Sequence, residues 1–386
     1  MKTPFHVVHV LEATEGGARR WLETVVEGLD ANAVRTSCIC SFRREADFRS
    51  TAERIRAWGV TVWEVDMRRS IHPVADARAL RRMVEILAAH PCDLLHGHCA
   101  KGGMLARMAG RLAGIPCVYS PHAFPYLCGG AASGLYRILE WLAIPATDAL
   151  MAVSEAEARE AVRLGHPAER VHTVLNGVAC PREALWRGPS PRAPLIGTLS
   201  ALRPQKDPHT FLEACAIVHR ARPEARFRLC GAGPLEGDAR KHVAALKLRD
   251  CIEMPGRVSR EFAAIETWDV FVLSSRYEGL SLALLEAMAA GVPVVVTDVP
   301  GNAEVVRHER SGLVVPAGDP VALAGAVLRL LDEPALARGL AEAARRRVLE
   351  RYGLGRQLGD LMGLYRAVLE GQGERDGAGA WAGGGM

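Results

Sequence analysis

Glu278 and Glu286 lie eight residues apart in the run RYEGLSLALLEAMAAGVPVVV and are well suited to bind a ligand rich in hydroxyl groups. Glu278 stands at a loop-to-helix junction after the apolar strand 270–274, whereas Glu286 lies inside the apolar helix that follows. Because a buried carboxylate is costly without a partner, vicinal hydroxyls of a ligand would stabilise Glu286. The helix start near Ser281 offers N–H groups and a positive dipole end to a phosphate. The pair therefore predicts a nucleotide-sugar site; the alternative is a capped amphipathic helix with an incidental interior glutamate.

Three further places hold residues that could contact a phosphate or a sugar. The strand HVVHVL runs into a turn with Gly16 and Gly17, whose backbone N–H groups could approach an anion, although any tight β-to-α turn uses glycine. His122 closes the run CVYSP and either faces a cleft or is a satisfied structural histidine. Arg203 and Lys206 lie in the turn GTLSALRPQKDP and either offer positive charge to a diphosphate or are solvated loop cations.

The composition indicates a folded, soluble protein with two domains. Of its 386 residues, 49% are hydrophobic and 24% are charged, which is typical of a folded protein. A chain of this length is too long for one ordinary hydrophobic core. Ten cysteines without paired short spacings predict free thiols in a reducing compartment, so we expect a cytoplasmic protein. A net charge of +4 gives no reason to expect a nucleic-acid partner. No apolar run reaches the roughly 18 residues that a membrane span requires.

A metal centre is not expected from the sequence. His96, His98 and Cys99 gather at the end of the run CDLLHGH, but no second ligand cluster accompanies them. The chain also has no Asp-x-Asp motif. We therefore predict a site that uses neither a metal nor a cofactor.

Short apolar runs alternate with helical periodicity and predict parallel sheets covered by helices on both faces. Helices are expected at 19–29, 73–89 and 101–113, and again beyond residue 320 with a break at 334. A stretch rich in proline and glycine predicts a linker between two α/β Rossmann-like domains, 1–185 and 186–370, before a disordered glycine-rich tail at 371–386. The expected strands are 5–11, 34–41, 60–65, 92–98, 116–121, 148–154, 170–175, 194–200, 226–231, 251–256, 269–275 and 292–298.

Taken together, these motifs resemble the retaining glycosyltransferases of family four, over nearly the whole chain to about residue 370. The strongest element is EGLSLALLEAMAAGVPVV, which carries the family's Glu-x7-Glu signature on Glu278 and Glu286. Supporting elements are the Gly16-Gly17 turn, SPHAF with His122, VLNGV, the Lys206 turn, PGNAE with Glu304, and SGLVVP. The resemblance implies the GT-B architecture, in which two Rossmann-like, doubly wound parallel-sheet domains face each other across a cleft.

The resemblance assigns donor-binding roles to residues of the second domain. It implies that Glu286 binds the ribose hydroxyls of the nucleotide and that Glu278 contacts the donor sugar. Backbone groups of Gly279 and Leu280 would reach the sugar or the phosphate, and Lys206 would bind the donor diphosphate. Glu278 and Lys206, together with His122 of the first domain, are therefore the expected catalytic residues.

In the first domain the resemblance implies that Gly16 and Gly17 approach the donor phosphate and that His122 sits beside the transferred sugar. One position departs from the family pattern. The family usually has an arginine five residues before its lysine, where this chain has Ala201. Arg203, three residues before the lysine, is the candidate replacement.

We therefore expect an enzyme that moves a sugar from a nucleoside diphosphate sugar, most often a UDP-sugar in this family, to a saccharide or lipid-linked saccharide. The segment LLHGHCAKGGMLARMAGRLAGIPCVYSPHAF looks like enzymes of bacterial surface-polysaccharide synthesis. Breaking the anomeric C–O bond would be assisted by Lys206 and helix N-terminal amides, without a metal ion. Two alternatives remain at this point. One is a nucleotide-sugar epimerase of the same architecture, and the other is a non-catalytic homologue, which only the departure at Ala201 suggests.

A lipid-linked acceptor would bring the first domain to the cytoplasmic membrane face. Arginine pairs at 19–20, 43–44, 68–69 and 81–82 could be attracted to anionic lipid, or they are solvated helix faces. The stretch 124–144 is the candidate anchor or, alternatively, an ordinary core helix. Its apolar side chains are Phe124, Tyr126, Leu127, Leu135, Tyr136, Ile138, Leu139, Trp141 and Leu142.

Overall fold

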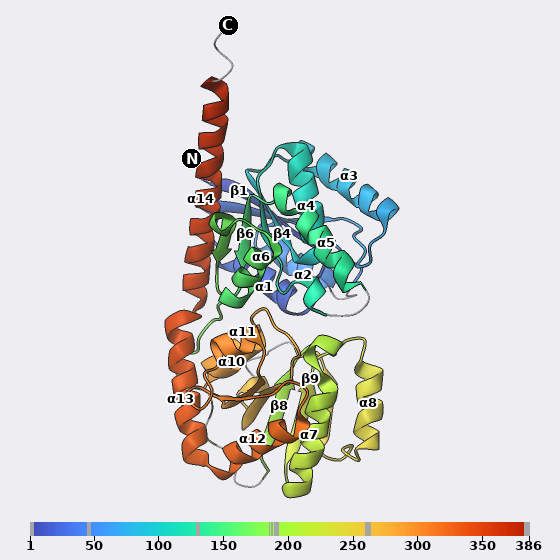
Figure 1. Ribbon diagram of the computed structural model, residues 1–386, viewed down its shortest axis with the longest axis vertical. Coiled ribbons are helices and arrows are strands. Elements are labelled where there is room, and N and C mark those ends of the chain that lie inside the picture. Colours follow the sequence, from blue (N-terminus) through green and yellow to red (C-terminus); the bar gives the residue numbers. More distant parts are fainter. Residues whose placement is uncertain are drawn as a thin grey trace. The chain divides into compact units, whose positions relative to one another are not determined.

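The computed structural model describes residues 4–44, 48–128, 132–184, 186, 188, 193–258 and 264–381. The chain forms two compact units, shown in Figure 1. Unit 1 consists of Met1–Leu175 together with Gln357–Met386, and unit 2 consists of Asn176–Arg356. Each unit has its own parallel sheet and its own hydrophobic core, so each is described by itself.

Unit 1 is built on a seven-stranded parallel sheet in the order β3-β2-β1-β4-β5-β6-β7. Every residue of the central strand β1 is buried, as expected for a strand covered on both faces. In the register of β1 with β4, His9 lies opposite His96. The strands are β1 (Phe5–Leu11), β2 (Val34–Cys40), β3 (Thr61–Glu64), β4 (Leu94–His98), β5 (Cys117–Ser120), β6 (Ala149–Ala152) and β7 (Val171–Thr173).

The helices of unit 1 cover this sheet. Their bounds are α1 (Gly16–Gly28), α2 (Phe48–Ala57), α3 (Pro73–Ala89), α4 (Cys99–Ala113), α5 (Ser133–Leu142), α6 (Glu155–Leu164) and α14 (Leu354–Trp381), with 3-10 turns η1 (Pro125–Cys128), η2 (Ile144–Ala146) and η3 (Ala168–Arg170). Helix α4 packs so closely that a Cβ at Gly102 would lie 2.8 Å from the Val10 carbonyl oxygen, and one at Gly103 would lie 2.2 Å from the Tyr119 ring. Glycine therefore sets the spacing between α4 and the central strands.

Unit 2 repeats the plan with six parallel strands in the order β10-β9-β8-β11-β12-β13. The strands are β8 (Leu195–Leu199), β9 (Arg226–Cys230), β10 (Ile252–Gly256), β11 (Val270–Leu273), β12 (Val294–Thr297) and β13 (Leu313–Val315). The helices are α7 (Pro208–Ala221), α8 (Glu236–Ala245), α10 (Leu282–Ala290), α11 (Pro300–Val305), α12 (Pro320–Asp332) and α13 (Pro334–Arg351), with the 3-10 turn η4 (Pro204–Lys206). The core of this unit joins one face of the sheet to α7 and α12.

The helices α7 and α10, which lie next to the candidate site, each begin at a residue whose side chain caps the helix. Asp207 caps α7 by accepting from the Thr210 N–H, and Ser281 caps α10 by accepting from the Leu284 N–H. Such a side-chain cap contributes about 1 kcal/mol. Helix α10 ends at Gly291 with φ +79°, the left-handed conformation that favours glycine.

The expected fold class is confirmed, and the expected strands are present as β1 to β12. The short β13 was not expected. Helix α3 spans 73–89 as expected, whereas α1 and α4 begin a few residues earlier than expected. No helix within the described part of the chain is both long and apolar enough to cross a membrane.

The division of the chain differs from the expected 1–185 and 186–370. Residues 176–186 belong to unit 2, because Val178 pairs with Gly353 and the Trp186 N–H donates to the Ala290 carbonyl. Residues from 357 onward belong to unit 1, where Tyr365 packs on Phe5. Residues 371–381, part of the stretch expected to be a disordered tail, are drawn as a continuation of α14. Residues 382–386 and much of the expected linker lie outside the described residues.

Candidate functional site

The strand order of both sheets places the expected site residues at one kind of position. The first six strands of each unit have the spatial order 3-2-1-4-5-6, and unit 1 adds a seventh strand at the end. The connections diverge between the first and fourth strands, and ligands of open α/β sheets bind at the carboxyl ends of the strands there. Gly16 and Gly17 follow β1, and His122 follows β5. Lys206 follows β8 and Glu278 follows β11, which are neighbours in unit 2.

Lys206 and Glu278 form an ion pair with each other. Lys206 Nζ lies 2.5 Å from Glu278 Oε1, and the two side chains are 17% and 4% exposed. Ser275 Oγ donates to the same carboxylate oxygen at 2.5 Å. The resemblance assigned these residues to different groups of one ligand; the structure adds that each is already partnered by the other. A phosphate reaching Lys206 would therefore compete with Glu278 for the ammonium group.

The loop that carries Lys206 is held to the loop that carries Glu278. Ser274 Oγ donates to the carbonyl oxygens of Lys206 and Asp207, each at 2.9 Å. Arg276 Nε donates to Asp207 Oδ2 at 2.9 Å, and the Arg276 backbone N–H donates to the Gln205 carbonyl at 2.8 Å. Asp207 itself has a positive φ of +46°. These bonds fix the backbone at Lys206, and the ion pair with Glu278 orients its side chain.

Two glycines of unit 2 allow backbone segments to meet at the same edge. A Cβ at Gly231 would lie 1.9 Å from the Ser200 carbonyl oxygen, so only glycine fits beside the β8 loop. A Cβ at Gly301, in the run PGNAE, would lie 2.5 Å from the Gly279 carbonyl oxygen. The start of α11 therefore packs directly on the loop that holds Glu278.

Glu286 lies in the second turn of α10 and is 3% exposed. Helical side chains lean toward the helix N-terminus, so Glu286 covers the turn that begins after Ser281. Gly279 and Leu280, just before that turn, are buried. Asn176 Nδ2 donates to the Leu280 carbonyl at 3.0 Å and thereby holds the segment. The structure thus brings Glu286, Gly279 and Leu280 together at one helix start.

Ala201 and Arg203 lie in the loop after β8. The Arg203 N–H donates to the Ala201 carbonyl at 2.9 Å, and Arg203 is the residue before η4. Both residues are partly exposed. Arg203 is therefore on the same loop as Lys206, three residues away along a single turn.

In unit 1 the glycine turn is open on the protein side. Gly16 has φ +59°, and a Cβ added at Gly16 or Gly17 would meet no atom of the described residues within 4 Å, chain neighbours aside. The turn is anchored by Arg44, whose guanidinium donates to both oxygens of Glu12 at 2.8 and 2.7 Å and also pairs with Glu15. These ion pairs fix the turn.

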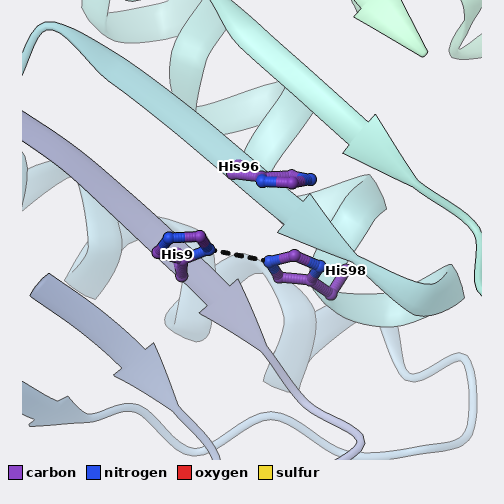
Figure 2. Close-up of side chains that lie close together, drawn as sticks. All are labelled: His9, His96 and His98. Atoms are coloured by element: carbon purple, nitrogen blue, oxygen red, sulfur yellow. Dashed lines mark hydrogen bonds between the residues drawn. The ribbon is translucent and has the colours of Figure 1, made fainter. Parts of the chain in front are cut away.

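Four histidines gather where β1, β4 and β5 end. Figure 2 shows three of them, His9 from β1 and His96 and His98 from β4. His9 Nδ1 lies 3.0 Å from His98 Nε2, and His98 Nδ1 lies 3.0 Å from His122 Nε2. His96 is bonded differently, with Nδ1 2.7 Å from the Tyr365 hydroxyl and Nε2 2.8 Å from Ser120 Oγ.

The imidazoles are uncharged at neutral pH. Desolvation lowers the pKa of His9 to about 3 and the pKa of His122 to about 4. Desolvation, reinforced by the neighbouring imidazoles, holds the pKa values of His96 and His98 well below their usual value. The four histidines therefore form an uncharged, hydrogen-bonded cluster at the buried carboxyl ends of β1, β4 and β5.

Potential ligand atoms of His9, His96 and His98 lie within 4.8 Å of one another, so these residues could hold a metal ion. The sequence reasoning noted His96 and His98 but missed His9. The adjacency of β1 and β4 was needed to see it, because the two segments are far apart in the chain. Both nitrogens of His96 and both of His98 already have hydrogen-bond partners, which favours a hydrogen-bonded cluster over a metal centre.

Family models match both halves of the chain. The model described as "Glycosyl transferases group 1" matches residues 187–347, and the one described as "Glycosyl transferase 4-like domain" matches residues 16–177. The two matched ranges fall almost entirely within unit 2 and unit 1, respectively. Together they include every residue that the sequence assigned to the site.

Two curated relatives are similar over most of their length. The D-inositol 3-phosphate glycosyltransferase of Thermobispora bispora is 31% identical over 305 residues, which cover 72% of this chain and 71% of the relative. The UDP-Gal:alpha-D-GlcNAc-diphosphoundecaprenol alpha-1,3-galactosyltransferase of Escherichia coli is 26% identical over 315 residues, covering 77% and 81%.

Solved structures share the fold. Anabaena Alr3699/HepE, crystallised with UDP and glucose, superposes with a TM-score of 0.78 at 18% identity, over 94% of this chain and 100% of that chain. Sucrose-phosphate synthase from Thermosynechococcus elongatus gives a TM-score of 0.76 at 19% identity, over 95% and 100%. Both likenesses establish the two-domain architecture.

Proposed function

Because the chain belongs to the group 1 glycosyltransferases, we propose that it moves a sugar from a nucleoside diphosphate sugar, preferably a UDP-sugar, to a saccharide hydroxyl with retention of anomeric configuration. Support for UDP comes from the similar Anabaena structure with UDP and from the Escherichia coli relative named for UDP-Gal. The polysaccharide role rests on relatives such as that galactosyltransferase.

The observation that carries this proposal is the Lys206–Glu278 pair beside the start of α10. Transfer breaks the bond between the anomeric carbon and a diphosphate oxygen, and a new bond forms to the acceptor oxygen on the same face. The acceptor's hydroxyl proton leaves with the diphosphate. Negative charge thus grows on the leaving group, where Lys206 and the α10 amides can stabilise it.

Glu278 has two roles in this scheme. It holds the Lys206 ammonium in place before the donor arrives, because the pair is 2.5 Å apart and Glu278 is almost fully buried. When the diphosphate attracts Lys206, the carboxylate is released to accept hydrogen bonds from hydroxyls of the donor sugar. Glu286, at the turn after Ser281, receives the ribose hydroxyls in the same way.

Arg203 supplies the second cation that the family usually places at the position of Ala201. It lies on the Lys206 loop, and the guanidinium suits bidentate phosphate binding. Arg203→Ala should weaken the affinity for UDP while leaving the affinity for uridine unchanged. Wild-type affinity for both would show that the loop relies on Lys206 alone.

Cationic side chains and helix amides would make a metal ion unnecessary. The experiment is to measure transfer in excess EDTA, with MgCl₂ and MnCl₂ added back separately. Undiminished turnover in EDTA is expected. A complete loss that only a divalent ion restores would overturn the metal-free scheme.

The test of the function itself is incubation with a panel of UDP- and GDP-sugars, with and without acceptor saccharides. A nuclear magnetic resonance spectrum of the product reports its anomeric configuration. We expect a glycoside with the donor's configuration and release of UDP. An inverted product would contradict retention, and an altered sugar still attached to its nucleotide would indicate an epimerase.

We further propose a lipid-linked acceptor, reached from the cytoplasmic membrane face through helix α5. Leu135, Ile138 and Leu142 recur at helical spacing on one side of α5 and are 50%, 55% and 60% exposed; Trp141 is 58% exposed. A helix with an apolar face, a tryptophan and Arg137 matches the composition of an interfacial helix. The diphosphoundecaprenol acceptor named for the Escherichia coli relative supports this choice.

The expected anchor region is corrected in part. Phe124 is fully buried and Tyr126 is 7% exposed, so these two rings belong to the core. Several of the arginines considered for lipid binding are engaged internally: Arg19 pairs with Glu23, and Arg44 with Glu12. Attachment would therefore depend mainly on α5.

Sedimentation with phosphatidylglycerol vesicles tests this surface. Ile138→Ser with Leu142→Ser removes two apolar anchors worth about 1.5 kcal/mol each, so vesicle affinity should fall about a hundredfold. Val321→Ser with Leu349→Ser, at positions 68% and 49% exposed in unit 2, is the matched control. Equal sedimentation of both double variants, or none by the wild type, would favour a soluble acceptor.

A further inference from the structure

The imidazoles of His9, His98 and His122 form a continuous hydrogen-bonded chain from the core of unit 1 to its sheet edge. The two links are each 3.0 Å, and the rings in contact are nearly parallel, with interplanar angles of 11° and 29°. A neutral imidazole has one N–H and one bare nitrogen. Each link therefore shares one proton, and the whole chain has only two possible arrangements of protons.

The inner end of the chain distinguishes the two arrangements. His9 Nε2 and the Trp21 indole nitrogen are both buried without a hydrogen-bond partner among the described residues. The Trp21 ring packs on the rings of His9, His98 and His122, with centroids 6.2, 4.8 and 5.3 Å away. Indole is a donor only. These two nitrogens make no hydrogen bond to each other. Among the described residues, a bare His9 Nε2 leaves one unpaired buried donor at this end, the indole N–H, whereas an N–H on His9 Nε2 would leave two. Unpaired buried N–H groups are rarer in proteins than unpaired acceptors, which favours the bare nitrogen.

With His9 Nε2 bare, the remaining protons are determined along the chain. His9 Nδ1–H donates to His98 Nε2, and His98 Nδ1–H donates to His122 Nε2. The proton of His122 must then be on Nδ1, the nitrogen that takes no part in the bond to His98. The outer end of the chain is a hydrogen-bond donor that carries no charge.

The backbone around His122 is held in a strained conformation that aims this ring. His122 and Ala123 have φ values of +52° and +86°, a backbone conformation that residues other than glycine rarely adopt. Glu157 stabilises the segment, because its two oxygens accept from the N–H groups of Ala123 at 2.6 Å and Val153 at 2.8 Å.

We propose that His9 and His98 are positioning residues that keep His122 in the Nδ1–H tautomer, so that it donates to an oxygen of the substrate sugar. The substrate contact rests on the proposed transferase function, whereas the tautomer does not. His96 lies against His98 with ring centroids 4.1 Å apart and tilted by 37°, but its own nitrogens are bonded to Tyr365 and Ser120. It is a buried histidine of the same cluster outside the chain and is therefore the natural control.

A metal ion would use the same atoms differently. His9 Nδ1 and His98 Nε2 would then be ligands and could not share a proton. The ionisable neighbours that act on His98 are His96, His122 and His9, so a buried divalent charge would meet neutral ligands only. Zinc binding is consequently an outcome that would contradict the proposal.

The first experiment reads the tautomer directly in the full chain. Long-range proton–nitrogen spectra of protein labelled with ¹⁵N-histidine show which ring nitrogen carries the proton, and His122→Asn identifies the signal. Nδ1–H at His122 is expected. Nε2–H at His122 would overturn the proposal, as would stoichiometric Zn²⁺ binding by wild type that His9→Asn abolishes. This experiment does not require enzymatic activity. The tautomer of His122 can therefore be determined even if no donor sugar is found.

The second experiment separates positioning from folding. His9→Leu removes the Nδ1 donor, and turnover should fall about tenfold with little change in donor KM. Tenfold is at the lower end of the losses seen when a residue that orients a functional side chain is removed. His9→Asn retains an amide donor near Nδ1 and should restore most of the turnover. His96→Asn should leave the His122 tautomer unchanged. Equal turnover of His9→Leu and His9→Asn would overturn the positioning role, and the wild-type spectrum remains the test if a variant does not fold.

Discussion

The two units share one sheet topology but differ in the chemistry at their carboxyl edges. Unit 2 presents fixed charges, with Lys206 paired to Glu278 and Arg276 paired to Asp207. Unit 1 presents neutral imidazoles, of which His9 and His98 are 0% and 1% exposed. A partly exposed ion pair keeps its charges for a charged leaving group. Buried imidazoles lose their charge, so they suit the recognition of hydroxyls.

The largest expected effect is on turnover, and it comes from removing the cation of the Lys206–Glu278 pair in unit 2. Lys206→Ala should lower turnover about a hundredfold to a thousandfold, the range for removing one donor that stabilises developing charge. Donor affinity should change less, because the contact strengthens as the diphosphate leaves. Steady-state kinetics with a UDP-sugar would measure both quantities.

The control for this variant addresses the carboxylate left behind. Lys206→Ala leaves the buried Glu278 without its cation, whereas the double change with Glu278→Gln does not. If the double variant recovered most of the turnover, the effect of Lys206→Ala would lie in the stranded carboxylate. Thermal unfolding of both variants would show any loss of stability.

The next effect concerns nucleotide affinity in unit 2. Glu286→Ala should weaken UDP binding about tenfold to a hundredfold, because a hydrogen bond to a charged group contributes about 1.5–3 kcal/mol. Isothermal titration calorimetry with UDP and with inorganic pyrophosphate would separate the ribose contact from the phosphate contact. Pyrophosphate affinity should be unchanged. Unchanged affinity for both UDP and GDP would remove the ribose role.

Sequence patterns were enough to predict both parallel sheets. The apolar runs gave β1 to β12, whereas β13 (Leu313–Val315) has only three residues and no alternation to distinguish it. Lys206 and Glu278 were each predicted, but their pairing depends on β8 and β11 being neighbours. The inclusion of His9 depends in the same way on β1 lying beside β4. Contacts between distant segments require the strand order, which local periodicity does not contain.

A third prediction uses pH to separate the units. Burial depresses the folded-state pKa of His9 to about 3, while in the unfolded chain the pKa of this group is near the ordinary histidine value of about 6.5. Below pH 6.5 the unfolded state takes up a proton that the folded state refuses, so stability decreases as the pH falls toward the folded pKa. Between pH 7 and pH 5 one such imidazole lowers the free energy of unfolding by about 2 kcal/mol.

Hydrogen exchange at pH 7 and pH 5, corrected for intrinsic exchange rates, would measure this loss segment by segment. Peptides from β1 and β4 should lose protection more than peptides from β8 and β11. The buried His9, His96 and His98 all belong to unit 1. Equal losses in the two units would show that the neutral cluster does not determine acid sensitivity.

The smallest expected effect tests whether backbone strain belongs to the imidazole site. Ala123→Gly relieves a φ of +86°, a conformation that costs about 1–2 kcal/mol for a residue with a Cβ. Glycine also gains unfolded-state entropy worth about 0.5–1 kcal/mol, so the net stabilisation should be about 0.5 kcal/mol. Lys247→Gly, at an exposed position of unit 2 with φ +58°, is the matched control. Urea unfolding should show small gains for both, but only Ala123→Gly should lower turnover, because it loosens the segment that aims His122. If both variants kept full turnover, the strain at Ala123 would be unrelated to the chemistry of unit 1.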